Sequence, residues 1–159
     1  MKGILQQLSP DEMLQLDNQI CFPLYATSKS MVAAYRPFLD RIGLTYTQYL
    51  VMMVLWSHPK GLTVRALGDK LYLDSGTLTP LLKKLDAKGF IVRDRDYLDE
   101  RVVIIRASSA GMSLKEDAYK VPVAMIKGIN NFTLAEVADL KRLLGKLHIS
   151  LQDFQFEEE

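Results

Sequence analysis

Residues 73–106 constrain the fold of this 159-residue chain more than any other stretch. Leu78, Leu82 and Leu85 recur at spacings of four and three, which predicts a helix with one buried stripe. The opposite face is small and hydroxylic at its start and cationic further on, as a helix that enters the major groove of DNA requires. We take the residues of that face as candidate DNA contacts: Ser75, Gly76, Thr77, Thr79, Pro80, Lys83 and Lys84.

The two ends of this helix are marked differently. Gly89 marks the C-terminal end, because glycine readily adopts the left-handed conformation that follows a helix. The N-terminal end has two candidate positions. Thr79 and Pro80 suit a cap and a first helical residue, whereas a start at Asp74 or Ser75 keeps one more turn. We favour the earlier start, although Pro80 then lacks the N–H for one hydrogen bond.

A hairpin is predicted to follow the helix. Two β-rich runs, residues 91–93 and 102–105, flank a charged tip that lies in water or against phosphate. Arg95 and Arg101 in this tip are candidate DNA contacts, and Asp99 is placed to hold Arg101. Isolated basic residues commonly form an ordinary solvated surface. Here a helix, a hairpin and a basic tip follow one another, which favours DNA binding over that alternative.

Composition and charge limit the classes of protein to which this chain can belong. The length suggests one domain, residues 1–159, and the 48% hydrophobic and 25% charged content excludes a disordered chain. The net charge is +1, but residues 60–106 hold 10 basic and 7 acidic side chains, a local charge of +3 that favours phosphate. No apolar run approaches a membrane span and the N-terminus lacks a signal-peptide core, so we expect a cytoplasmic protein without membrane contact.

Capping signals upstream predict two further helices. Thr45 and Gln48 form a capping box for a nearly all-apolar core helix. Thr63 caps a second helix at 64–71, and a short turn leads from it into the candidate DNA-reading helix. Helix, turn, helix and hairpin in this order are typical of a winged helix-turn-helix, which we place at residues 45–106. The predicted fold class is therefore mainly α with a small β-hairpin wing.

The flanking parts, residues 9–44 and 107–159, are predicted to be helical and to form a dimer. A helix that starts at Asp17 or Asn18 has a wide apolar face, and the helix after the wing is expected to bend at Pro122. The last helix carries a heptad-like seam of Val137, Leu140, Leu144, Leu147, Leu151 and Phe154. This seam packs either on its own chain or against a second copy. We prefer a homodimer, since the terminal helices offer more apolar face than one small winged domain can cover.

Metal, disulfide and enzyme chemistry have little support in the sequence. The chain has one cysteine, Cys21, and two histidines, His58 and His148, so we expect no metal centre, no cofactor and no intrachain disulfide. It contains no nucleophile elbow, Cys-x-x-Cys motif or glycine-rich phosphate loop. We therefore expect a binding protein and not an enzyme. A lone cysteine on an apolar helix face is usually a small core residue.

Three segments resemble a known family. The segment LDSGTLTPLLKKLDAKGFIVRDRDYLDERVVI, with Asp99-Glu100-Arg101 in its wing, resembles the DNA-binding core of the MarR family of transcriptional regulators. The segments ICFPLYA and YRPFLDRIGLTYTQYLVMMVLW resemble more narrowly its thiol-based peroxide sensors, the organic hydroperoxide regulators of the OhrR type, in their one-cysteine subgroup. The resemblance covers roughly Leu16 to Gly111.

This resemblance implies roles for four residues. Cys21 resembles the reactive thiol of these sensors. Tyr35 and Tyr46 resemble two tyrosines that hydrogen-bond to the thiol from the partner subunit, and Tyr25 is placed to close the pocket. A cysteine in the first turns of a helix lies near the positive end of the helix dipole, and phenolic O–H groups stabilise a thiolate further. The thiolate attacks peroxide and becomes a sulfenic acid.

The implied function is a homodimeric redox-sensing regulator, a repressor in our interpretation. It leaves a pseudo-palindromic operator in double-stranded DNA when an organic hydroperoxide oxidises Cys21. Some relatives resolve the sulfenic acid with a second cysteine, which this chain lacks. The oxidised thiol then either forms a mixed disulfide, for example with a low-molecular-weight thiol, or over-oxidises. The alternative is a MarR-type regulator released by a small phenolic or aromatic ligand, with Cys21 incidental.

Overall fold

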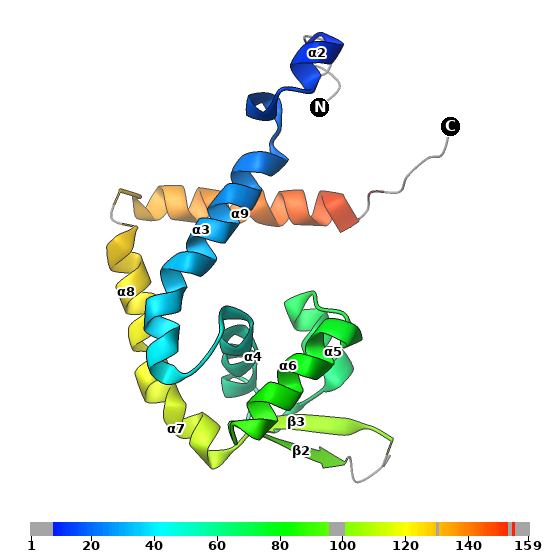
Figure 1. Ribbon diagram of the computed structural model, residues 1–159, viewed down its shortest axis with the longest axis vertical. Helices are drawn as coiled ribbons and strands as arrows, with labels where there is room; N and C mark the ends of the chain where they lie inside the picture. Colours follow the sequence, from blue (N-terminus) through cyan, green and yellow to red (C-terminus); the bar gives the residue numbers. More distant parts are fainter. Residues whose placement is uncertain (1–7, 96–100, 130, 153, 155–159) are drawn as a thin grey trace. The chain divides into compact units, whose positions relative to one another are not determined.

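The computed structural model (Figure 1) describes the following residues: 8–95, 101–129, 131–152 and 154. The chain divides into two compact units, Met1–Pro122 and Val123–Glu159. None of the described helices is long and apolar enough to span a membrane. The described residues are mainly α-helical with one small antiparallel sheet, which confirms the predicted fold class.

The first unit holds most of the helices and all strands of the described sheet. Its helices and helical turns are α2 (Pro10–Met13), η1 (Leu16–Asn18), α3 (Cys21–Leu39), η2 (Asp40–Ile42), α4 (Tyr46–Trp56), α5 (Val64–Leu71), α6 (Ser75–Ala87) and α7 (Ser109–Ala118). Its strands, in the sheet order β1-β3-β2, are β1 (Leu62–Thr63), β2 (Ile91–Arg95) and β3 (Val103–Ala107). The hairpin of β2 and β3 is the predicted wing. Strand β1 was not predicted, because two residues are too few to show an alternating pattern.

The predicted start of the long helix α3 is wrong. Asp17 and Asn18 lie in the turn η1, and the N-cap of α3 is Ile20, whose side chain makes no capping hydrogen bond. Two features reduce the need for a side-chain cap. Pro23, third in the helix, has no N–H, and the N–H of Phe22 donates to a backbone carbonyl of the preceding turn at 3.3 Å.

Helices α4, α5 and α6 share one apolar core with the sheet. Leu55, Leu67, Leu82 and Ile105, one from each of α4, α5, α6 and β3, are at most 1% exposed. Helices α5 and α6 lie side by side, and α6 packs on β2 (Figure 1). The predicted capping box of α4 is confirmed, since the N–H of Thr45 donates to the Gln48 side chain at 3.1 Å. These contacts fix the helix-turn-helix and its wing as one body.

The turn between α5 and α6 depends on one glycine. The N–H of Leu73 donates to the carbonyl oxygen of Gly68 at 3.0 Å. A Cβ at position 68 would lie 2.7 Å from the carbonyl oxygen of Leu73, which is too close for any other residue. Between them Tyr72 adopts the left-handed conformation, with φ of 54°. This tight turn sets the direction in which α6 leaves α5.

The helix after the wing is interrupted earlier than predicted. α7 ends at Ala118, and α8 (Lys120–Gly128) begins after Tyr119, whereas the bend was expected at Pro122. A proline cannot donate a hydrogen bond to the carbonyl four residues earlier, here that of Ala118, and its ring crowds that carbonyl. The interruption therefore lies on the N-terminal side of the proline.

The second unit contains most of α8 and the helix α9 (Leu134–Gln152). A capping box starts α9, since the N–H of Thr133 donates to Glu136 at 2.8 Å and the N–H of Glu136 donates to the Thr133 hydroxyl at 3.2 Å. Apolar residues of the predicted seam remain exposed on this helix, including Leu144 at 42% and Leu151 at 62%.

Candidate nucleic-acid interface and thiol site

Helix α6 separates buried from exposed residues as predicted. Leu78, Leu82 and Leu85 are at most 1% exposed. All seven candidate DNA-contact residues of α6 are exposed, namely Ser75, Gly76, Thr77, Thr79, Pro80, Lys83 and Lys84. The helix therefore offers a small, hydroxylic and cationic surface of the kind that fits a major groove about 12 Å wide.

Asp74 fixes the start of this surface. The backbone N–H of Thr77 donates to Asp74 Oδ1 at 2.8 Å, and the Thr77 hydroxyl donates to Oδ2 at 2.8 Å. The earlier of the two predicted helix starts is thus confirmed. The backbone hydrogen bond from Thr77, and then the one from its hydroxyl, lower the pKa of the Asp74 carboxyl. Since the hydroxyl proton is used in the cap, Thr77 offers a ligand an acceptor oxygen and a methyl group.

Ion pairs tie the wing to α6 and join its two strands. Arg93 of β2 pairs with Asp86 of α6, with Nε 3.1 Å from Oδ2. Arg106 of β3 donates from Nε to Oδ2 of Asp94, in β2, at 2.8 Å. Neither Arg106 nor Asp86 was a predicted site residue, because these pairs follow from the strand register and the packing of β2 on α6. The pair of Arg93 with Asp86 thus holds the wing against α6.

Two basic residues near the wing tip lie at the end of β2 and shortly before β3. Arg95 was expected in the tip but is the last residue of β2, because its pairing with Val103 extends the ladder beyond the β-rich run. It is exposed and makes no ion pair with any described residue. Arg101 is exposed on the other side of the tip. Asp99 lies outside the described residues, so its contact with Arg101 stays a prediction.

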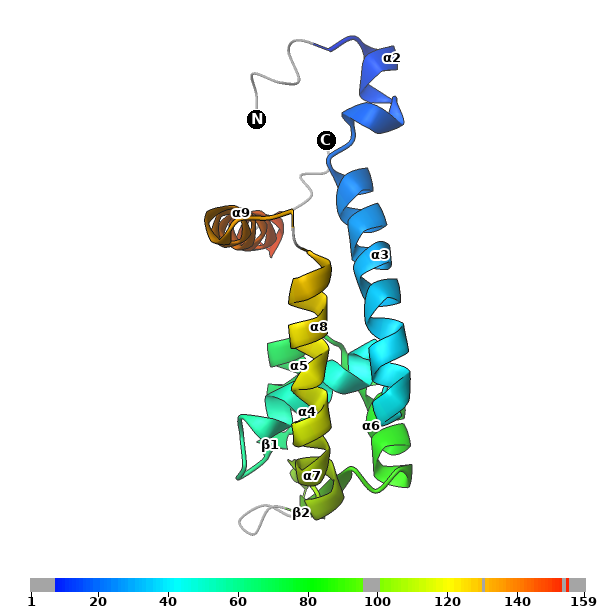
Figure 2. The same cartoon turned by 90° about the vertical axis from the view of Figure 1, so that its left-hand side faces the viewer.

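Cys21 is the first residue of α3 and is exposed in the single chain. The C-terminal end of α3 lies beside α4, whereas its N-terminal half extends away from α4, α5 and α6 in both views (Figure 1, Figure 2). Tyr25, one turn after the cysteine, is 60% exposed, and the Lys29 ammonium lies 5.2 Å from the centroid of its ring. Within the first unit the predicted thiol is therefore open to a reactant or to another protein surface.

Tyr35 and Tyr46 meet where α3 packs on α4. Their ring centroids lie 5.0 Å apart at an interplanar angle of 61°, and the Tyr49 ring is 6.2 Å from that of Tyr35. Burial, and then the proximity of the Tyr46 phenol, raise the pKa of Tyr35. Tyr35 therefore keeps its proton at neutral pH and remains a hydrogen-bond donor.

One chain does not bring Cys21 to this pair of tyrosines. Cys21 and Tyr35 are fourteen residues apart on the continuous helix α3. At a rise of about 1.5 Å per residue their Cα atoms are separated by roughly 21 Å. A hydrogen bond between the thiol and either tyrosine would require the cysteine of a second chain.

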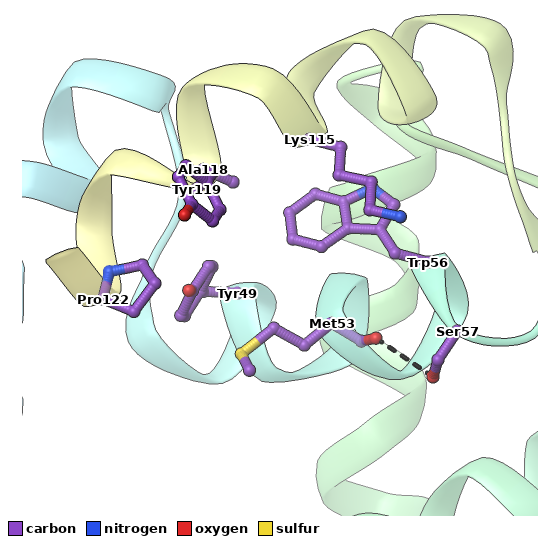
Figure 3. A pocket seen from close by; sticks show the side chains of 8 residues that line it. All are labelled: Tyr49, Met53, Trp56, Ser57, Lys115, Ala118, Tyr119 and Pro122. Carbon is purple, nitrogen blue, oxygen red and sulfur yellow. Dashed lines mark hydrogen bonds between the residues drawn. The ribbon is translucent and has the colours of Figure 1, made fainter.

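An apolar pocket of about 270 Å³ lies between α4 and α7 (Figure 3). Trp56 forms one wall and donates its indole N–H to the carbonyl oxygen of Gly111 at 2.8 Å. The full lining is Tyr49, Met53, Trp56, Ser57, Lys115, Ala118, Tyr119 and Pro122. This pocket was not predicted from the sequence, because its walls come from helices that are distant in the chain. Across the described part of the chain no group of His, Cys, Asp and Glu side chains is arranged to hold a metal ion.

Known proteins resemble this chain in sequence and in fold. A family model described as transcriptional regulator SarA/Rot matches residues 33–118. An organic hydroperoxide resistance transcriptional regulator of Bacillus subtilis (strain 168) is 44% identical over 139 residues, which cover 87% of this chain and 91% of that protein. This chain belongs to the MarR family of transcriptional regulators. The predicted resemblance to the OhrR type within the MarR family is thereby confirmed.

Further members of the MarR family agree with this assignment. The HTH-type transcriptional regulator SarZ of Staphylococcus aureus (strain USA300) is 40% identical over 121 residues, which cover 76% of this chain and 79% of SarZ. AbfR of Staphylococcus epidermidis has been solved on DNA in reduced and overoxidized forms, with TM-scores of 0.75 and 0.72, at 30% identity over 96% of this chain and 98% of AbfR. The chain is thus a DNA-binding transcriptional regulator and not an enzyme.

Proposed function

We propose that this regulator is a homodimeric repressor that holds a pseudo-palindromic operator while Cys21 is reduced and leaves it when an organic hydroperoxide oxidises Cys21. The observation that carries the proposal is the exposed cysteine at the start of α3, in a chain 44% identical to an organic hydroperoxide resistance regulator. Each α6 enters a major groove, and each wing places Arg95 or Arg101 at the neighbouring minor groove. Asp99 holds Arg101 in that position.

A second copy supplies what one chain lacks. Ile20, Leu24 and Val32 on α3 are 71%, 36% and 40% exposed. Apolar surface of this kind is typical of an interface. A partner packed against this face brings its Cys21 to the Tyr35–Tyr46 pair, whose O–H groups donate to the thiolate. The dimerising parts are residues 9–44 and 107–159, as the sequence predicts.

The chemistry at Cys21 has two steps. The thiolate sulfur attacks one peroxide oxygen, the O–O bond breaks and, with one proton taken up, a sulfenic acid and an alcohol form. A low-molecular-weight thiol then condenses with the sulfenic acid to give a mixed disulfide and water. Overoxidized AbfR is bound to DNA in its solved structure. We therefore assign operator release in this chain to the mixed disulfide, which puts a bulky adduct between Cys21 and the tyrosines and changes the spacing of the two wings.

Cys21→Ser tests this proposal. The variant should bind the DNA upstream of its own gene as the wild type does, yet stay bound after cumene hydroperoxide and a small thiol release the wild type. Gel shift measures binding, and intact mass detects the thiol adduct on the wild type. Ser28→Ala, on the same helix, is the matched control and should be released like the wild type. Release of Cys21→Ser by peroxide would exclude Cys21 as the sensor.

The pocket of Figure 3 favours a second candidate function, release by a small phenolic or aromatic ligand. Its volume is near the lower end for ligand sites, which is about 300 Å³. Its aromatic walls and the exposed Lys115 suit an aromatic acid. Such a ligand would release Cys21→Ser as readily as the wild type, and Met53→Trp, which fills the pocket, would abolish the response.

A further inference from the structure

A polar contact joins the C-terminal end of α6 to the corner between α3 and α4. Lys88, the C-cap residue of α6, donates from Nζ to the carbonyl oxygen of Gly43 at 2.6 Å and to Oε1 of Gln48 at 3.0 Å. The two acceptors are 45 and 40 residues away in the chain. Gln48 is 3% exposed, so the ammonium group reaches a buried side chain.

The same Gln48 oxygen organises the corner itself. It accepts the backbone N–H of Thr45 at 3.1 Å, which closes the capping box at the start of α4. Tyr46, the first residue of α4, packs its ring on Tyr35 with centroids 5.0 Å apart. One short segment therefore carries both a tyrosine of the candidate thiol site and the acceptors of the ammonium group.

Lys88 is held firmly at its own end as well. Its backbone N–H donates to the carbonyl oxygen of Lys84 at 3.2 Å, and the next residue, Gly89, has a φ of 72°. The N–H of Phe90 then donates to the carbonyl oxygen of Leu85 at 3.0 Å. Because this end of α6 is closed by its own hydrogen bonds, a displacement of Lys88 displaces the helix.

We propose that Lys88 is a positioning residue that couples the tyrosine-bearing corner to the DNA-reading helix. The core that α4 and α6 share is apolar, and apolar packing has no directional preference. A pair of oriented hydrogen bonds adds a directional constraint on α6 to this packing. When the corner moves, the ammonium group carries the movement to α6, and the distance between the two α6 helices of the proposed dimer no longer matches the half-site spacing of the operator. The response to peroxide rests on the proposed function, whereas the orientation of α6 does not.

The first test uses the reduced full-length protein and an operator duplex selected from a random library. Lys88→Met removes the hydrogen-bond donor, and Gln48→Met removes one of its two acceptors, at a buried position, together with the capping contact to Thr45. The wild type should bind the selected half-site spacing more tightly than a spacing changed by one base pair. In both variants the ratio of these two affinities should fall by about two- to thirtyfold. Lys84→Met is the matched control, since loss of an exposed cation on α6 should weaken binding at all spacings alike.

The second test compares oxidised with reduced protein, with intact mass ensuring equal modification of Cys21. The ratio of the two Kd values should fall in Lys88→Met by a similar factor, and should be kept in Lys88→Arg, whose guanidinium still donates. The double variant of Lys88 and Gln48 should lose no more than Lys88→Met alone, which already removes both hydrogen bonds. A merely structural role would lower stability and the affinity of both states together, and would leave the ratio unchanged.

The outcomes separate the two proposals. An unchanged spacing preference in both Lys88→Met and Gln48→Met would overturn the positioning role, even where peroxide releases the wild type. Weaker binding of Lys88→Met at all spacings alike, as in Lys84→Met, would assign Lys88 to a direct phosphate contact and would overturn it too. A wild type that peroxide does not release, with the spacing preference lost in both variants, would overturn the proposed function and support the positioning role.

Discussion

Helix α6 and the N-terminal half of α3 both carry apolar faces, yet a single chain covers only that of α6. Leu82 of α6 is 1% exposed in the shared core, whereas Ile20 and Tyr25, at the start of α3, are 71% and 60% exposed. Close packing of apolar side chains fixes a helix in place. The proposed DNA-binding surface is therefore built within one chain, while the thiol-bearing half of α3 has an apolar face that the same chain leaves exposed.

The largest expected effect is a difference in stability between two leucine-to-alanine substitutions, one in α6 and one in α3. Leu82→Ala removes a fully buried side chain and leaves a cavity, so the free energy of unfolding should fall by about 2–5 kcal/mol. Leu24→Ala removes a side chain that is 36% exposed. It should cost the single chain less than about 1.5 kcal/mol and weaken self-association instead. Urea unfolding and sedimentation equilibrium measure the two quantities.

The dependence on protein concentration is the control for this pair. Destabilisation that comes from weaker association changes with concentration, whereas the cost of a core cavity does not. A loss of stability in Leu24→Ala as large as in Leu82→Ala, with unchanged self-association, would mean that α3 is packed within its own chain. The contrast between the two helices would then be wrong.

Local signals in the sequence predicted what local interactions determine. The capping box of Thr45 with Gln48, the cap at Asp74 and the left-handed Gly89 each involve residues within one or two turns, and the structure has all three. The leucine spacing also identified the buried side of α6. A cap and a buried stripe follow from helix geometry alone, so no knowledge of the tertiary structure was needed.

Contacts set by tertiary structure escaped prediction. Lys88 bonds to a corner 40 and 45 residues earlier, and Trp56 donates to Gly111 in another helix. Arg93 pairs with Asp86 because β2 packs on α6. The proposed thiol site was still harder to predict from the sequence of one chain. Tyr35 lies roughly 21 Å along α3 from the cysteine of the same chain, so the proposed site depends on a partner that a single chain does not supply.

A smaller effect is expected at the corner between α3 and α4, which Lys88 links to α6. Tyr46→Phe removes one phenolic O–H but keeps the ring that packs on Tyr35. A hydrogen bond to a charged group contributes about 1.5–3 kcal/mol. If the Tyr46 hydroxyl stabilises the partner's thiolate, as proposed, oxidation of Cys21 by cumene hydroperoxide should slow by about ten- to a hundredfold. Intact mass followed over time measures the rate.

Tyr119→Phe is the control for this substitution. Tyr119 is 73% exposed beside the pocket of Figure 3, outside the pair formed by Tyr35 and Tyr46. Its variant should be oxidised at the wild-type rate. Oxidation of Tyr46→Phe at that same rate would break the proposed link between the corner and the thiol, and would make Cys21 independent of α4.

The smallest expected effect is a pH dependence at the start of α6. Hydrogen bonds from Thr77 hold the pKa of Asp74 below its usual value of 3.8. The Asp74 carboxylate therefore stabilises the start of α6 fully above about pH 4, and this stabilisation is lost as the pH falls through the lowered pKa. Asp74→Asn keeps a side-chain cap without a titrating group. Protection of the Thr77 amide against hydrogen exchange should fall in acid in the wild type and stay level in this variant.

Hydrogen exchange at a single amide is needed because the free energy of global unfolding also depends on the titration of other carboxyl groups. Hydrogen bonds within their own capping boxes also lower the pKa of Glu12 and of Glu136, so acid weakens several helix starts at once. The start of α3 differs, since Ile20 provides no side-chain cap there. Protection of its first turn should not follow a carboxyl titration. A loss of protection at the start of α3 over the same pH range would mean that the thiol-bearing helix is coupled to acid-sensitive groups elsewhere. The first turns of α3 and α6 would then no longer differ in what stabilises them.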